Sequence, residues 1–199
     1  MSTDPGKELD TVQRRQGKRR RPGQGGVAMI AGAGDGLGIA LARACLDVGF
    51  TVHVVGRSLP RLQQRMKTLA GAAGRLNCHQ ADLRDPLAVD ALFEQVSATH
   101  GAPDLVVFNA GAQYRKPFID ITPEMFEQVW KLSCYAGFLV GHAAARAMLP
   151  RQSGSIIFSG ATASIRGASA FAAFSSAKFG LRAVAQSMAR ELGDRKSVV

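Results

Sequence analysis

The chain has 199 residues, of which 46% are hydrophobic and 20% charged, and its formal net charge is +10. A chain of this length and composition can bury the core of one α/β domain. No apolar run reaches the ~20 residues that a membrane-spanning helix needs, and the basic N-terminus lacks the apolar segment of a signal sequence. We therefore expect a cytoplasmic protein with no membrane partner.

The positive charge is concentrated at the N-terminus. Residues 1–26 contain seven basic and three acidic side chains, five glycines and two prolines, and almost nothing apolar. This composition predicts a disordered basic tail, because it cannot offset the entropy lost on folding. A basic arm can bind nucleic acid. We favour a solvated tail, or a start site upstream of the real domain, over a nucleic-acid partner.

Apolar β-branched runs alternate with helical patterns across residues 27–193, which predicts an α/β fold of the Rossmann type, a three-layer doubly wound parallel sheet. The predicted strands are Val27–Ala31, Thr51–Val55, Leu76–Gln80, Asp104–Phe108 and Ser155–Ser159. The predicted helices are Leu37–Val48, Leu59–Leu69, Pro86–Thr99, Pro123–Leu149 and Phe171–Leu192.

A glycine-rich segment joins the first predicted strand to the first predicted helix. Its residues are Gly32, Gly34, Asp35, Gly36, Leu37 and Gly38. Gly32 would form the tight turn, Gly36 would let backbone amides approach a pyrophosphate, and Gly38 would let the helix pack close to the strand. This order of elements predicts a dinucleotide site; the alternative is an ordinary glycine-rich loop.

The end of the second strand indicates which dinucleotide is bound. Gly56 stands where an NAD-selective protein usually has an acid for the ribose hydroxyls, and Arg57 follows it. Arg57 would pair with a 2′-phosphate, which favours NADP, although NAD remains an alternative. Asp35 adds a negative charge beside the phosphate site and argues against NADP. An exposed Arg57 with no role is the other reading.

Three motifs in order resemble the short-chain dehydrogenase/reductase family over residues 27–193. Residues 31–38 are similar to its T-G-x-x-x-G-x-G turn, Asp82-Leu83 to its adenine-contacting acid, and Asn109-Ala110-Gly111 to its N-A-G motif. The resemblance implies an oxidoreductase that transfers hydride between a nicotinamide and an alcohol or carbonyl. It implies that Asp82 accepts from the adenine amino group, Asn109 stabilises the sheet and Gly111 leaves room for the cofactor.

The family's catalytic pattern, S-x12-Y-x-x-x-K with a helical asparagine, is only partly present. Lys178 is retained, but Phe174 stands at the tyrosine position, Ala161 at the serine position and Ser133 at the asparagine position. A phenyl ring cannot transfer a proton, so the usual acid–base step is absent. Two readings stay open. One is catalysis by another hydroxyl, with Ser159, Thr162, Ser164, Ser175 and Tyr135 near in sequence. The other is a non-catalytic NAD(P)-binding sensor or oligomer partner, in which Lys178 holds the ribose.

The C-terminus departs from the family pattern after Gly193. Residues 194–199 are interpreted as a non-family tail that could be an artefact, and the sheet is expected to lack the family's last two strands. The fifth strand would then be an exposed edge that promotes self-association, whereas a longer parent would form a homo-oligomer. The spacing of the four histidines and three cysteines suggests no metal site or disulfide. The small-molecule substrate is unknown.

Overall fold

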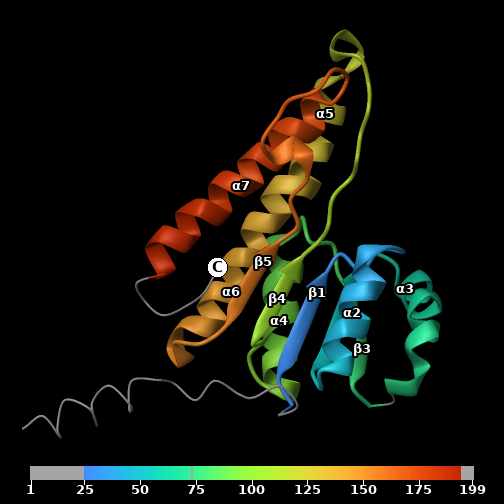
Figure 1. Ribbon diagram of the computed structural model, residues 1–199, viewed down its shortest axis with the longest axis vertical. Coiled ribbons are helices and arrows are strands. Elements are labelled where there is room, and N and C mark those ends of the chain that lie inside the picture. Colours follow the sequence, from blue (N-terminus) through green and yellow to red (C-terminus); the bar gives the residue numbers. More distant parts are fainter. Residues whose placement is uncertain (1–24, 73, 194–199) are drawn as a thin grey trace, which may run out of the picture.

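The computed structural model describes residues 25–72 and 74–193. Most of the predicted basic tail and the segment after Gly193 therefore lie outside the described residues. The described part forms a five-stranded parallel sheet in the order β3-β2-β1-β4-β5 (Figure 1). The predicted doubly wound Rossmann-type fold is confirmed.

The elements agree closely with the predicted ones. The strands are β1 (Val27–Ala31), β2 (Thr51–Gly56), β3 (Leu76–Gln80), β4 (Leu105–Phe108) and β5 (Ser155–Phe158). The main helices are α2 (Leu37–Asp47), α3 (Leu59–Met66), α4 (Pro86–His100), α5 (Pro123–Trp130), α6 (Ala136–Met148) and α7 (Ala172–Gly193). Short 3-10 turns occur at η1 (Lys67–Ala72), η2 (Phe118–Asp120), η4 (Leu149–Arg151) and η5 (Thr162–Ser164).

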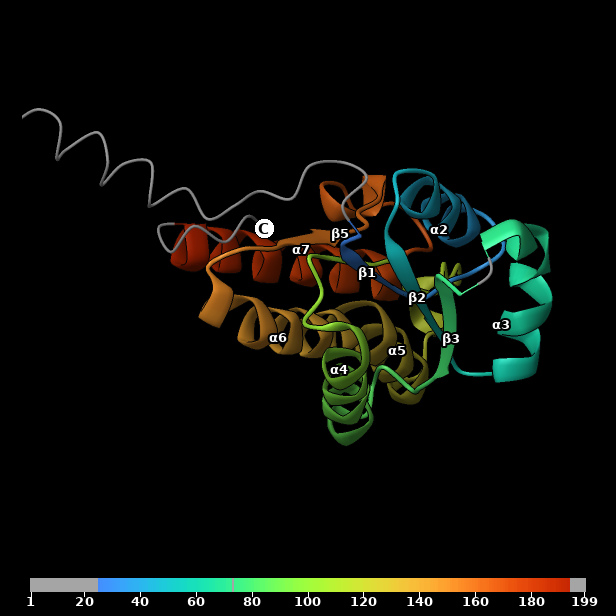
Figure 2. The ribbon, with the colours of Figure 1, turned by 90° about the horizontal axis from the view of Figure 1, so that it is seen from below.

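Helices cover both faces of the sheet, with α2 and α3 against one face and α4 and α6 against the other (Figure 2). Alternating strand residues divide the core accordingly: Ile30 and Val54 pack toward α2 and α3, whereas Met29 and Val55 belong to the cluster that includes residues of α4 and α6. Leu181 of α7 joins this second cluster. Both faces are apolar because a parallel sheet is covered on both sides.

The long predicted helix at 123–149 is interrupted. A π-helical turn, η3 (Lys131–Tyr135), separates α5 from α6 without breaking the helical path. The helical periodicity predicted over 123–149 is present, but the sequence did not predict this turn, because a π-turn leaves no clear mark in the apolar pattern. The turn buries Ser133 and Cys134, and such turns occur frequently at functional sites.

Strand β5 is one of the two outer strands of the described sheet. It pairs with β4 from Leu105↔Ser155 to Phe108↔Phe158. Ile156 is buried, but Ile157 faces the other side and is 50% exposed. The predicted edge position is therefore confirmed for the described residues, and it carries an exposed apolar side chain.

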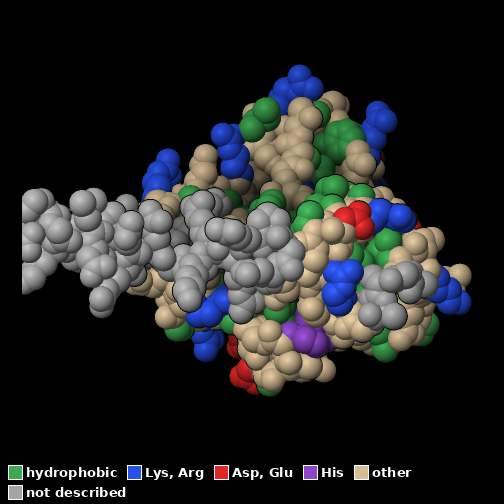
Figure 3. Space-filling model, turned by 60° about the horizontal axis from the view of Figure 1, so that its bottom comes forward, with side chains coloured by type: hydrophobic (Ala, Val, Ile, Leu, Met, Phe, Trp, Pro, Cys, Tyr) green, Lys and Arg blue, Asp and Glu red, His purple; other side chains and the backbone are tan. Residues whose placement is uncertain are grey.

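Charged side chains are dispersed over the surface. On the face shown in Figure 3, lysine and arginine side chains lie scattered and do not form a continuous patch. In the described part of the chain, no helix is long and apolar enough to cross a membrane. The three cysteines, Cys45, Cys78 and Cys134, are free thiols, and burial raises the pKa of each.

Three histidines that are distant in sequence meet on the α4 side of β2 and β3. His53 is 1% exposed, and its Nδ1 lies 2.8 Å from Nε2 of His79. The ring of His100, the last residue of α4, has its centroid 5.0 Å from that of His53. The predicted helix ended at Thr99, one residue before His100, and the sequence gave no indication of this cluster. Among the described residues, no group of metal-ligating side chains could hold a metal ion.

The histidine cluster predicts that acid destabilises the fold. Burial, followed by the charges of His79 and His100, lowers the pKa of His53 from 6.5 to about 4. Between these values the unfolded chain binds more protons than the folded one, so stability is present above pH 6.5 and is lost as the pH falls toward 4. We expect the free energy of unfolding to fall by roughly 2–3 kcal/mol across this window.

Urea unfolding of the wild type and of His53→Leu at several pH values measures this effect. The variant should lose most of the slope between pH 6.5 and 4. His142→Ala is the matched control, because His142 is exposed on α6. A slope that is the same in His53→Leu and in the wild type would contradict the assignment to His53.

Candidate functional site

The glycine-rich turn after β1 is held by hydrogen bonds from both neighbouring strands. The amides of Gly32 and Ala33 donate to the carbonyl of Val55, at 3.2 and 3.1 Å. On the other side, Nδ2 of Asn109 donates to the carbonyl of Gly32 at 3.1 Å, and the Asn109 amide donates to Ala31. The turn is therefore fixed at the carboxyl edge of the sheet, where ligands of this fold class bind.

The glycines of this turn fall into two kinds. Gly32 has φ +95°, and a Cβ there would lie 2.5 Å from the amide nitrogen of Ala110. A Cβ on Gly38 would lie 2.7 Å from Cα of Ala33, so the start of α2 packs directly on the turn. Gly34 and Gly36 differ, because a Cβ at either position would meet nothing within 4 Å. Open space over these two residues fits a phosphate group approaching the backbone.

The residues predicted to lie at the nicotinamide end of the cofactor are close together in the structure, around Lys178. This side chain is 5% exposed, and its Nζ donates to the carbonyl of Ser159 at 2.8 Å. A Cβ on Gly111 would lie 3.5 Å from that Nζ and 3.6 Å from Oγ of Ser133. Burial lowers the pKa of Lys178. A buried lysine and a buried hydroxyl therefore both lie beside Gly111.

At the substituted catalytic positions, Phe174 and Ala161 offer no hydroxyl, and only Ser133 carries one. The ring centroid of Phe174 lies 5.9 Å from Nζ of Lys178, so the ring is close to the lysine but offers no hydroxyl. Ala161 is exposed, and its amide donates to Oγ of Ser164 at 3.0 Å. Ser133 accepts from the amide of Ala112 at 3.3 Å.

The alternative hydroxyls are differently placed. Ser175 is buried, and its Oγ has no hydrogen-bond partner among the described residues. Tyr135 stacks between Trp130 and Phe138, with centroid distances of 6.4 and 6.3 Å. Thr162 and Ser164 lie in the 3-10 turn η5. None of the contacts of these residues given by the structure includes Nζ of Lys178, whose polar partner is the Ser159 carbonyl.

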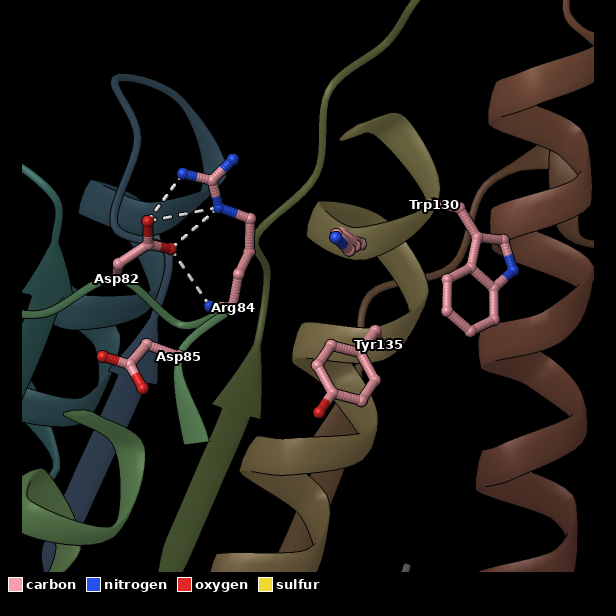
Figure 4. Close-up of a pocket in the computed structure, with 6 residues that line it drawn as sticks. Asp82, Arg84, Asp85, Trp130 and Tyr135 are labelled. Atoms are coloured by element: carbon pink, nitrogen blue, oxygen red, sulfur yellow. Dashed lines mark hydrogen bonds and ion pairs between the residues drawn. The ribbon is translucent and has the colours of Figure 1, made fainter. Parts of the chain in front are cut away.

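At the position predicted to bind the adenine of the cofactor, Asp82 forms an ion pair with Arg84. Asp82 follows β3, and Nε and Nη2 of Arg84 donate to its Oδ1 and Oδ2 at 2.9 and 2.6 Å (Figure 4). The Arg84 amide donates to the same carboxylate at 3.0 Å. The hydrogen bond from the Arg84 side chain is the largest of several effects that lower the pKa of Asp82, among them the charge of Arg57. Neighbouring Leu83 is buried.

A cavity of about 580 Å³ lies beside this ion pair. It is lined by Asp82, Arg84, Asp85, Trp130, Lys131 and Tyr135. Figure 4 shows the Asp82–Arg84 pair on one side and the aromatic rings of Trp130 and Tyr135 on helical segments across from it. Of these six residues, Asp82 was a predicted site residue and Tyr135 was one of the alternative hydroxyls, whereas the other four match no motif of the family.

Asp35 is also paired. Arg65 of α3 forms an ion pair with it, and Nη2 of Arg65 donates to Oδ2 at 2.9 Å. The negative charge that argued against NADP at the sequence level is therefore neutralised by a partner 30 residues away in the chain. Leu37, the first residue of α2, is 55% exposed. Neither Arg65 nor Arg84 was predicted as a site residue.

These residues line one edge of a doubly wound sheet, which defines a dinucleotide-binding protein. The sequence model of the short chain dehydrogenase family matches residues 26–199. A short-chain dehydrogenase from Rhodopseudomonas palustris is 42% identical, with a TM-score of 0.81 over 86% of this chain and 80% of that one. A metagenomic short-chain oxidoreductase in complex with NADP is 29% identical, with a TM-score of 0.83 over 89% and 80%.

A curated relative gives the same result. Versicolorin reductase stcU of Emericella nidulans is 31% identical over 88% of this chain and 66% of its own length. The chain spans about two thirds of the length of the curated relatives it matches. It belongs to the short-chain dehydrogenase family, whose members are NAD(P)-dependent oxidoreductases.

Proposed function

We propose that this chain binds NADP(H) in preference to NAD(H), with Arg57 as the partner of the 2′-phosphate. The observation that carries the proposal is the end of β2, where Gly56 stands in place of an acid and Arg57 is exposed. In the part of the chain that the structure describes, Arg57 forms no ion pair. An exposed guanidinium at this place fits a phosphate dianion.

Titration of nicotinamide fluorescence with NADPH and NADH tests this preference. We expect the wild type to bind NADPH more tightly by about 1–3 kcal/mol, the scale of a hydrogen bond to a charged group. Arg57→Ala should lose most of that difference. Arg43→Ala, an exposed arginine on α2, is the control and should keep it. Equal affinities in the wild type would contradict the proposal.

The residues present also fit the rest of the cofactor. We propose that the pyrophosphate lies over Gly34 and Gly36 and that Lys178 holds the nicotinamide ribose, which the open space at the two glycines and the buried ammonium support. When bound, the nicotinamide supplies hydride chemistry. We propose that the protein is an oxidoreductase of this kind, acting on an alcohol or carbonyl of unknown structure.

A second candidate function is a non-catalytic NADP(H)-binding sensor or oligomer partner. Phe174 beside Lys178 favours it, because no hydroxyl stands where the family transfers its proton. A turnover assay across a panel of aldehydes, ketones and alcohols, run after cofactor binding has been measured, separates the two. Binding with turnover supports the enzyme, and binding with no turnover of any compound supports the sensor.

We further propose a cytoplasmic homo-oligomer. The free thiols are consistent with a reducing compartment. Members of the family are generally oligomeric. We propose that the self-contact surface is the stacked row of aromatic side chains that runs from the end of α5 through η3 to α6, because Trp130 and Phe138 are 38% and 44% exposed there. Exposed aromatic side chains on a helical surface are typical of contacts between subunits.

A further inference from the structure

The carboxyl ends of three neighbouring strands bring five charged side chains to one edge of the sheet. Asp35 follows β1, Arg57 follows β2 and Asp82 follows β3, and the order β3-β2-β1 places Arg57 in the middle. The flanking acids are held by Arg65 and Arg84, respectively. Arg57 is close enough to Asp82 for its charge to lower the pKa of that carboxyl.

The net charge of this edge favours either a ribose with a 2′-phosphate or a ribose without one. The three arginines and two aspartates sum to one positive charge. Without Arg65 and Arg84, the two carboxylates would flank Arg57 and leave a net negative charge. A 2′-phosphate carries about two negative charges near pH 7, by analogy with other phosphate monoesters. It would be repelled in that case, whereas an unphosphorylated ribose would not.

We infer that Arg65 and Arg84 are specificity-determining residues, which act through Asp35 and Asp82 and make this edge selective for the phosphorylated ribose of NADP(H). The inference rests on the proposed NADP(H) binding and deepens it. Both pairs suit this role because they are geometrically fixed: Arg84 holds both oxygens of Asp82, and Arg65 joins the turn to α3. Each pair is also partly exposed, so its own contribution to stability is small.

Calorimetric titration of the 199-residue protein with NADPH and NADH, at low and high salt, tests the inference. Arg65→Ala and Arg84→Ala should each lower the affinity for NADPH about threefold to fivefold, with affinity for NADH changed less than about twofold. High salt should shrink the difference, because salt screens exposed charges. Arg146→Ala, which removes an exposed pair with Asp90, is the matched control and should change neither affinity.

A charge-rescue variant separates electrostatics from structure. Asp35→Asn combined with Arg65→Ala removes both members of the pair, so it should restore the wild-type preference for NADPH. If the single variants lose both cofactors equally, or if the double variant fails to recover the preference, the inference is overturned. A wild type that binds neither cofactor would overturn the proposed function itself, whereas a wild type that binds NADPH with a preference unaffected by Arg65→Ala and Arg84→Ala would overturn this inference alone.

Discussion

Phe174→Tyr combined with Ala161→Ser should give the protein carbonyl reductase turnover that the wild type lacks, or raise existing turnover by about 10²–10⁴-fold, the usual contribution of general acid–base catalysis. Phe174 already lies beside Lys178, with 5.9 Å between the ring centroid and Nζ. The ordinary pKa of ~10 of a tyrosine would be lowered by this ammonium toward working pH. The serine at 161 would supply the second hydroxyl of the family pattern.

Initial rates with NADPH and a carbonyl panel measure this gain. Phe171→Tyr is the matched control, because it adds a hydroxyl in the same segment, where Phe171 faces Arg115 at 6.0 Å and not Lys178. Adding Lys178→Met to the double variant should remove the gain. A double variant that binds NADPH as the wild type does, yet reduces no more than Phe171→Tyr, would show that the two hydroxyls do not limit the reaction.

Gly32→Ala is expected to destabilise the fold by about 3–5 kcal/mol, since it combines a strained left-handed backbone with overpacking. Gly32 has φ +95°, and its new Cβ would lie 2.5 Å from the Ala110 nitrogen, which is backbone and cannot move aside cheaply. For a domain of this size the melting temperature should fall by roughly 10 °C. Circular dichroism during heating measures it.

Gly36→Ala provides the comparison within the same turn. A Cβ there meets nothing within 4 Å, so the melting temperature should stay near that of the wild type. NADPH affinity should nevertheless fall, because the added methyl group would occupy the space left for the pyrophosphate. A melting temperature of Gly32→Ala equal to that of Gly36→Ala would show that the turn relaxes more easily than its contacts imply.

The sheet could be predicted from sequence because its three inner strands, β1, β2 and β4, are buried on both faces and are therefore apolar along most of their length. The outer strands β3 and β5 are less buried, yet β3 also has the predicted bounds. The helical region at 123–149 was predicted only as a helix. Its π-turn at Lys131–Tyr135 was not predicted, and neither was the close packing of α6 on α7, where Gly137 lets the side chain of Leu181 approach.

The site was predictable where a motif fixes a backbone path, and not where side chains meet through the fold. The positions of Gly32, Asn109 and Lys178 followed from their motifs. The pair of Asp35 with Arg65 did not, because these residues are 30 positions apart, nor did the contact between His53 and His79, 26 positions apart. Asp82 and Arg84 are only two positions apart, but side chains at this spacing meet only where the chain turns. The sequence therefore did not predict their ion pair.

The π-turn η3 bears on how the number of residues in this helical region can differ between relatives. Its five residues, Lys131–Tyr135, form a wider turn than the α-helices on either side, so it accommodates one residue more than a regular helix would. Deleting exposed Lys131 would therefore let the turn become regular α-helix while α5 and α6 keep their rotational phase relative to each other. Relatives that are one residue shorter in this helix should therefore carry the gap here, and they would present the same row of side chains along the outer surface of α5.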